Sequence, residues 1–317
     1  MGPYFEYYTS RCKEFLCDGG ENVSVKTHAE GLRIARLILQ GEDKEAILRE
    51  LAGGSEQYTR QRKLYEASID LIAGLLTMAD VGVLESRATG RRPLKWTTGS
   101  LHSLLAMEFA HQKEMDATTN AKIEKRFIAN NISKIAGIEL KWTNNLADHL
   151  LLHGDDKSVY IFHHAEFLKF QSQVLAVGFW PDGLLEETLR TLALLFPQND
   201  RGTRRLIAGI KGIDQTVRCC GISRAQDRRF EKFSVWHDRL VILKQAFDDS
   251  QPHKITQWWW DRRNSVQWYT FWVAILVFVL TVFFGTVQSI EGALQVYLSY
   301  KSLQGEDGEG LHVRSSG

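Results

Sequence analysis

Two short segments carry the side chains best suited to chemistry. Asp148-His149 and His163-His164-Ala165-Glu166 combine imidazoles with carboxylates. These groups transfer protons and bind metal ions in proteins. The sequence therefore offers one weak candidate polar site, which consists of Asp148, His149, His163, His164 and Glu166.

A zinc site of the deaminase type would need more than the His-x-Glu triplet at 164–166. Its second half reads Pro-Cys-x-x-Cys, and the four cysteines, Cys12, Cys17, Cys219 and Cys220, do not have this spacing. They form no disulfide framework either, because two of them are adjacent in the chain. We expect reduced thiols, a cytosol-facing domain, and neither a metal ion nor a cofactor.

Other polar patterns are better explained by local structure than by catalysis. Asp155-Asp156 and Asp248-Asp249 lack the third carboxylate of a magnesium site, and they suit a turn and a helix end. Residues 209–212 lack the glycine spacing of a nucleotide-binding loop. Because no catalytic motif is present, the sequence favours a non-enzymatic protein.

The elements that would position the candidate site are short β-strands in a mainly helical chain. Residues 138–143 alternate apolar and polar side chains, and residues 158–163 do so more loosely. Gly154-Asp155-Asp156 predicts a turn before the second run. We expect a small β-hairpin or two-stranded patch within residues 138–163, with 145–150 as a helical turn.

Apolar residues at helical spacing dominate the rest of the chain. The clearest stripe predicts a long helix that faces the core or forms a coiled coil, and we expect it to transmit or stabilise assembly. It comprises Phe230, Phe233, Trp236, Leu240, Leu243 and Phe247. The predicted organisation is an N-terminal helical region (1–90), a helical domain with the β element (91–250), an aromatic juxtamembrane segment (251–267), a transmembrane helix (268–290) and a polar, largely disordered tail (291–317).

The transmembrane helix is the firmest prediction. No charged residue occurs in the 27 positions from Asn264 to Ile290, and twelve of residues 268–287 are Ile, Leu, Val or Phe. On the insertion scale those twelve favour the membrane by about 4–7 kcal/mol. Twenty helical residues cover about 30 Å, the thickness of the hydrocarbon core.

The two flanks of this segment differ. Aromatic and basic residues suited to the membrane interface precede it, whereas Glu291 opens the other flank. The positive-inside rule then places the N-terminal domain in the cytosol. The predicted interface residues are Trp258, Trp259, Trp260, Arg262, Arg263, Trp268, Tyr269 and Trp272.

Two further surfaces suggest contacts. Gly285, Ser289 and Ala293 are spaced by four, as in helices that pack closely in membranes, and they predict self-association. Residues 201–229 hold eight bases and two acids, a stretch that suits either contact with anionic headgroups or a solvated face. The net charge of the 317-residue chain is only +1, which gives no reason to expect nucleic acid as a partner.

The chain resembles a group of filamentous-fungal membrane proteins of unassigned activity. The resemblance rests on Trp258–Trp272, on Phe284–Tyr297, and on Asn145–Leu150 with Ile161–His164. It implies a fungal origin and a membrane address. More distantly, a helix that runs from a cytosolic domain into the membrane resembles CorA-type magnesium transporters. That family has a second span and a Gly-Met-Asn motif, whereas Gly285 is followed here by Thr286, so ion conduction is not implied.

Three functions follow as hypotheses. The first is a single-pass, non-enzymatic protein whose cytosolic domain binds a protein partner or senses a signal at the bilayer. The second is a degenerate, oligomeric CorA-like channel or transporter, and the third is a membrane-tethered enzyme that uses the candidate polar site. Expected partners are the lipid bilayer, further copies of the chain and a protein partner, with no nucleic acid.

Overall fold

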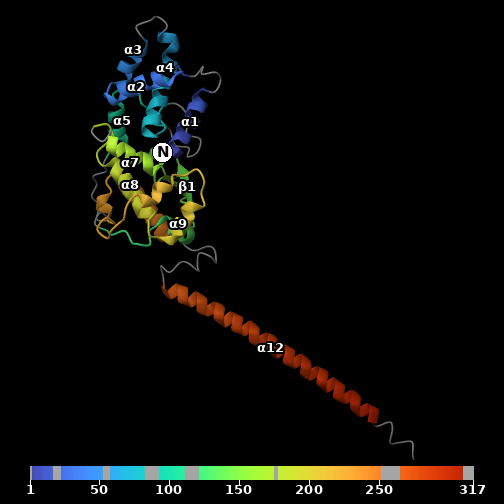
Figure 1. The fold of residues 1–317 in the computed structure, drawn as a ribbon. Coiled ribbons are helices and arrows are strands. Elements are labelled where there is room, and N and C mark those ends of the chain that lie inside the picture. The colour runs from blue at the N-terminus through green and yellow to red at the C-terminus, as the bar shows by residue number, and fades with distance from the viewer. Residues whose placement is uncertain are drawn as a thin grey trace, which may run out of the picture. The chain divides into compact units, whose positions relative to one another are not determined.

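Helices make up most of the chain, as the apolar spacing predicts (Figure 1). Contacts divide the chain into two compact units, Met1–His253, hereafter the domain, and Lys254–Gly317. The structure is a computed structural model, and it describes residues 2–16, 23–52, 58–82, 93–110, 121–174, 178–250 and 265–309.

Four helices form the N-terminal part of the domain: α1 (Gly2–Leu16), α2 (His28–Leu39), α3 (Lys44–Ala52) and α4 (Tyr58–Thr77). A capping box starts α2, in which Thr27 Oγ1 accepts the Glu30 N–H at 3.3 Å and Glu30 Oε2 accepts the Thr27 N–H at 3.2 Å. α4 contacts the other three helices. Lys44 Nζ donates to Asp70 Oδ1 at 2.6 Å and to the Trp96 carbonyl at 2.8 Å, so a buried ion pair ties α3 to α4.

The β element is larger than the predicted hairpin. β2 (Leu152–His153) and β3 (Ser158–Phe162) are antiparallel, which confirms the hairpin. Its turn holds Asp155 and Asp156 in the left-handed region, with φ of 52° and 61°, which aspartate tolerates. β1 (Glu139–Thr143), however, pairs with β3 in parallel, so the sheet has three strands in the order β1-β3-β2. Parallel neighbours need a crossover of a dozen or more residues, and residues 144–157 supply it with η4 (Leu146–Asp148) and β2.

β3 is the centre of this sheet and is buried at every position. Such burial explains why its alternation is only loose in the sequence, since both faces of a central strand can be apolar. α7 (Ala165–Val174) and α8 (Leu184–Leu195) pack on each other, and both contact η5 (Gln215–Cys219). α9 (Arg201–Ala208) also contacts η5 (Figure 1).

The six-residue aromatic and aliphatic stripe from Phe230 to Phe247 is buried throughout. It therefore belongs to the domain's own core, and its side chains are not available to a coiled-coil partner. The helix that it predicts is also shorter than expected. η6 (Phe230–Lys232) is a separate turn, and α10 (His237–Asp249) begins only after Trp236. Asp248 and Asp249 end α10, as expected of a helix end.

Apolar spacing within residues 99–137 predicts two helices, of about residues 100–114 and 118–135. α5 (Leu101–Glu108) is shorter than the first of these, and Ser100 Oγ caps it by accepting the Ser103 N–H at 3.2 Å. Residues 121–128 are not helical, since Ile123 N donates instead to the Arg228 carbonyl at 2.8 Å. The helical turns α6 (Ala129–Asn131) and η3 (Ile132–Ala136) follow.

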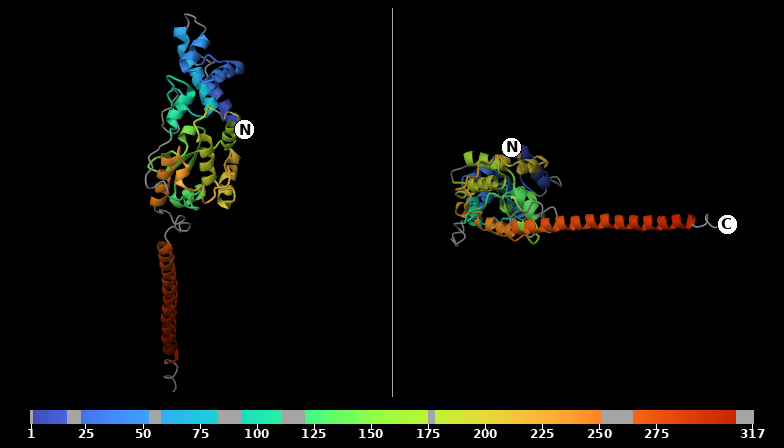
Figure 2. Two further views of the ribbon diagram at one scale, coloured as in Figure 1. Left: turned by 90° about the vertical axis from the view of Figure 1, so that its left-hand side faces the viewer. Right: turned by 90° about the horizontal axis from the view of Figure 1, so that it is seen from below.

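The second unit contains α12 (Ser265–Glu309), a single helix of 45 residues (Figure 2). The expectation of a largely disordered tail is wrong for residues 291–309, which continue this helix. The reason is composition, because Ala293, Leu294, Gln295 and Leu298 favour helix and no proline occurs after Pro252. At 1.5 Å per residue the helix is about 68 Å long.

Candidate functional site

Asn144 lies beside the His163-His164 pair because each follows the last residue of a strand. β1 and β3 are parallel and in register, with Thr143 opposite Phe162. Their C-terminal ends therefore meet at one edge of the sheet. This edge is where open α/β sheets most often bind ligands, which makes it the first place to test the candidate residues.

The two histidines bind the same amide oxygen. Asp214 N donates to His163 Nδ1 at 3.2 Å, so the proton of this imidazole lies on Nε2, which donates to Asn144 Oδ1 at 3.1 Å. His164 Nε2 lies 2.7 Å from the same oxygen, and the two rings stack with centroids 4.0 Å apart. Burial lowers the pKa of His163 to about 4, against an opposing effect of Asp214. Burial, and then the neighbouring His163, lower the pKa of His164 to about 2. Both rings are thus neutral at physiological pH.

His149 has its own set of partners. Its Nδ1 accepts the Phe162 N–H at 3.2 Å, so Nε2 donates to Thr191 Oγ1 at 2.7 Å. Trp236 packs edge-on against the ring at 4.9 Å. Burial, and then the charge of Arg239, lower the pKa of His149 to about 3. This imidazole links β3 to α8 and contributes to the core.

The two candidate carboxylates lie on η4 and α7. Asp148 is buried at the end of η4. Glu166 lies in the first turn of α7 and is half-buried, and its backbone N–H donates to Asp214 Oδ2 at 2.7 Å. The structure therefore brings His163, His164 and the Glu166 backbone together around Asp214 and Asn144.

Asp214 is the residue that the sequence analysis missed. Its Oδ1 accepts Thr216 N at 2.8 Å and Thr216 Oγ1 at 2.7 Å, while Oδ2 accepts the Glu166 N–H. One buried carboxylate thus caps both η5 and α7. The Asp-x-Thr spacing indicates the local cap, but nothing in the sequence indicates the contact to α7, which lies 48 residues away.

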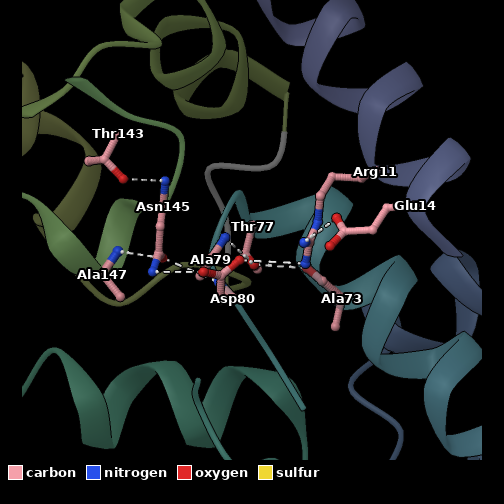
Figure 3. A network of polar contacts seen from close by, with 9 residues as sticks. All are labelled: Arg11, Glu14, Ala73, Thr77, Ala79, Asp80, Thr143, Asn145 and Ala147. Carbon is pink, nitrogen blue, oxygen red and sulfur yellow. Dashed lines mark hydrogen bonds and ion pairs between the residues drawn. The ribbon is translucent and has the colours of Figure 1, made fainter. Parts of the chain in front are cut away.

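A second polar network adjoins this edge (Figure 3). Asn145 Oδ1 accepts Asp80 N at 3.2 Å and Ala147 N at 3.1 Å, and its Nδ2 donates to Asp80 Oδ2 at 3.3 Å. Arg11 Nη2 of α1 lies 3.5 Å from Asp80 Oδ1. Tyr7, one turn before Arg11, lies with its ring centroid 6.2 Å from that of His164, and burial raises its pKa. The network attaches α1 and the end of α4 to the sheet.

The arrangement is a structural hydrogen-bond network and shows no metal centre. Within the described ranges, no group of three or more His, Cys, Asp and Glu side chains could hold a metal ion. The lone pairs on Nδ1 of His149 and Nδ1 of His163 each accept a backbone N–H. His164 uses Nε2 to bond Asn144, so its lone pair is on Nδ1. Cys12, Cys219 and Cys220 are free thiols, and Cys17 lies outside the described residues.

The predicted membrane residues fall on α12 and just before it. Trp268, Tyr269 and Trp272 lie in the first turns of the helix, with Trp268 in ring contact with the other two at 5.2 and 6.1 Å. Gly285, Ser289 and Ala293 lie on one exposed face, and a Cβ on Gly285 would meet nothing within 4 Å. The remaining predicted interface residues lie outside the described residues: Trp258, Trp259, Trp260, Arg262 and Arg263.

Among the described residues, one helix is long and apolar enough to cross a membrane. It covers Trp268–Ser302, its best window has a mean hydropathy of 2.4, and none of that window is buried against the rest of the chain. Comparisons of the chain with family models, with curated proteins and with solved structures found no significant match.

Proposed function

We propose that this protein is a single-pass membrane protein whose N-terminal domain faces the cytosol and binds a partner or senses a signal at the bilayer. One observation carries the proposal. None of the apolar window of α12 is buried against the rest of the chain, and a soluble protein would bury such a surface. Its length also exceeds the roughly 20 residues that a span requires.

The residues that flank the span support the orientation. Arg262 and Arg263 precede α12, and Glu291 is the first charge after the apolar run. Basic residues stay on the cytosolic side during insertion. Trp268 and Trp272 suit the headgroup region, because an indole ring there is buried while its N–H stays hydrated.

The domain's polar residues support a binding rather than a catalytic role. His149, His163 and His164 are neutral, buried and hydrogen-bonded to side chains or backbone of their own domain. A general base or metal ligand needs a nitrogen lone pair available to a substrate or ion. At His149 and His163 this lone pair already accepts a backbone N–H. The third hypothesis, a tethered enzyme at these residues, would therefore depend on Nδ1 of His164.

The hydroxyl groups on α12 favour an anchor over a pore lining. Thr281 Oγ1 donates to the Val277 carbonyl at 2.8 Å, and Thr286 Oγ1 donates to the Phe283 carbonyl at 2.7 Å. Hydroxyls bonded to their own helix suit contact with lipid, where no water is available. Self-association through Gly285, Ser289 and Ala293 is compatible with such an anchor.

Membrane extraction and glycosylation mapping test the proposal. The full-length chain should stay in membranes after carbonate washing, and an Asn-x-Ser acceptor added after Gly317 should be glycosylated. The acceptor sequences at Asn22 and Asn131 should stay unmodified. Val277→Arg should raise the fraction of protein released, because a charge at the centre of a span costs about 3 kcal/mol, roughly half of what the apolar side chains contribute. Val296→Arg, outside the central span, is the matched control. Release of the unmodified chain by carbonate would refute the membrane anchor. Glycosylation at Asn131 would show that the N-terminal domain faces the opposite side of the membrane.

A further inference from the structure

Six basic side chains form a surface on and around α9. Arg201, Arg204 and Arg205 are exposed on one face of this helix, because positions i, i+3 and i+4 align, while Thr203 and Ile207 are buried on the other. The remaining bases lie in the loops and turn that follow. We call this set the basic surface, and it comprises Arg201, Arg204, Arg205, Lys211, Arg218 and Arg224.

The elements that carry the basic surface are joined to each other. Gln215 Nε2 of η5 donates to the Ile207 carbonyl at 3.5 Å and the Ile210 carbonyl at 3.4 Å, which holds η5 against the end of α9. Arg218 lies in η5. The charges therefore lie on neighbouring elements of one fold and are not merely close in sequence.

Few acidic residues accompany this surface. Asp214 is the only acid between Arg201 and Gln226, and this residue is 3% exposed and bonded inside the domain. Asp200 and Asp227 border the stretch, and their carboxylates accept the backbone N–H groups of Thr203 and Arg224 at 2.6 and 2.9 Å. In the described part of the chain, no carboxylate forms an ion pair with any of the six bases. The basic surface is therefore locally positive, although the net charge of the whole chain is close to zero.

An apolar side chain lies among these charges. Ile222 is 69% exposed, between Arg218 and Arg224 in the chain. It follows Gly221, whose φ is 125°. Basic residues around an exposed aliphatic side chain are typical of surfaces that rest on a bilayer, where the charge meets headgroups and the apolar group enters the interface.

The place where the chain leaves the domain adjoins α9. Phe247, in the last turn of α10, is in ring contact with Phe127 at 5.6 Å. α6 follows Phe127 directly and contacts α9, where a Cβ on Gly202 would meet Asn130 within 3 Å. Figure 1 places α9 at the end of the domain remote from α2 and α3. Residues 251–264 then connect α10 to α12, and fourteen residues extend to about 50 Å at most.

We propose that the basic surface binds the anionic phospholipid headgroups of the membrane that α12 spans, with Ile222 entering the interface. This inference rests on the proposed anchoring and orientation, which place the domain beside the cytosolic leaflet. That leaflet carries the anionic lipids. Tethering by residues 251–264 keeps the surface at a high effective concentration near the bilayer.

Amide hydrogen exchange on the full-length protein in lipid nanodiscs tests this contact. The discs contain phosphatidylcholine alone or with added phosphatidylserine. Amides of residues 201–224 should exchange more slowly in the anionic discs, and high salt should remove the difference. Each base near an anionic surface contributes roughly five-fold, so the triple variant Arg204→Gln, Arg205→Gln and Lys211→Gln should weaken the contact about 100-fold.

A second triple variant controls for total charge. Lys13→Gln, Lys26→Gln and Arg36→Gln remove three exposed bases elsewhere in the domain and should leave the protection unchanged. Equal exchange in both kinds of disc, with the protein still firmly inserted, would overturn the lipid contact but leave the anchor standing. Failure to insert at all would overturn both. Protection by an added RNA oligonucleotide, with none from phosphatidylserine, would assign the surface to nucleic acid instead.

Discussion

Glu187 organises the start of α10 from a different helix, and its replacement should destabilise the domain strongly. The carboxylate belongs to α8 and is 3% exposed. Its Oε1 accepts the N–H groups of Val235 and Trp236 at 2.8 and 2.7 Å, and its Oε2 accepts the N–H and hydroxyl of Ser234 at 2.8 and 3.1 Å. These three residues precede α10, so their N–H groups have no partner within the helix.

Glu187→Gln keeps the shape of the side chain but turns one acceptor oxygen into a donor. Two of these four donors then face an amide NH₂ group and lose their acceptor. Each unsatisfied buried donor costs about 1–3 kcal/mol, so the variant should lose about 4 kcal/mol of the free energy of unfolding. Domains are stable by only about 5–15 kcal/mol, and this loss is therefore a large fraction.

Urea unfolding of the full-length protein in mild detergent, followed by tryptophan fluorescence, measures the effect. With a slope of about 3 kcal/mol per M for a domain of this size, the midpoint should fall by about 1.3 M. Glu186→Gln is the matched control, since Glu186 is the exposed neighbour on the same helix. Hydrogen exchange at Ser234 and Trp236 should rise in the Glu187 variant alone. A midpoint shift no larger than that of the control would refute the assigned role.

Three further predictions follow from buried polar groups. The three buried histidines have pKa values in the folded domain below the unfolded value of about 6.5. The domain is therefore most stable above pH 6.5, and it loses free energy of unfolding as the pH falls toward 4. Each histidine lowers that free energy by about 1.4 kcal/mol per pH unit. Urea midpoints should therefore fall steeply between pH 6.5 and 5. They should fall less steeply in a His149→Asn variant, when each protein is compared with its own midpoint at pH 7.5, and an equal fall in both proteins would contradict the buried, neutral state of His149. Asp214→Ala should lower the free energy of unfolding by about 2–4 kcal/mol, because the starts of α7 and η5 lose their cap. The amides of α7 and η5 should then exchange hydrogen faster than those of the other helices. Unchanged exchange in these two elements would contradict the assignment of Asp214 as the cap of both. Lys44→Met leaves Asp70 buried without its cation and should cost about 3–5 kcal/mol in the same unfolding assay, whereas a cost near zero would show that water reaches Asp70.

The sequence predicts best those features that one segment determines alone. α12 follows from an uncharged apolar run, and the turn at Asp155-Asp156 follows from local backbone preferences. The parallel pairing of β1 with β3 cannot be predicted from either strand alone, because strand direction depends on what the crossover between them packs against. Likewise the stripe from Phe230 to Phe247 predicts burial correctly but not where its helix starts, since that start depends on Glu187, more than 40 residues away.

The candidate polar site illustrates the same limit. The sequence identifies His163 and His164 as unusual, and the structure places them at one sheet edge. Their partners Asn144 and Asp214 come from other elements, and those partners show that the imidazoles are engaged in the fold. Residue types alone cannot distinguish a histidine that holds a protein together from one that acts on a substrate.

The length of the continuous helix α12 bears on how deeply the helix would insert into a bilayer. Glu291 and Lys301 are the first two charges after Arg263, so Glu291 alone interrupts an otherwise uncharged stretch on the far side. If α12 spans a membrane as proposed, this carboxylate is the first charged group after the apolar run to resist entry into the hydrocarbon core. Replacing it with glutamine would leave ten more residues, about 15 Å of helix, without a charge. The helix would then be free to slide along its axis toward the domain side, which would move the domain away from the bilayer.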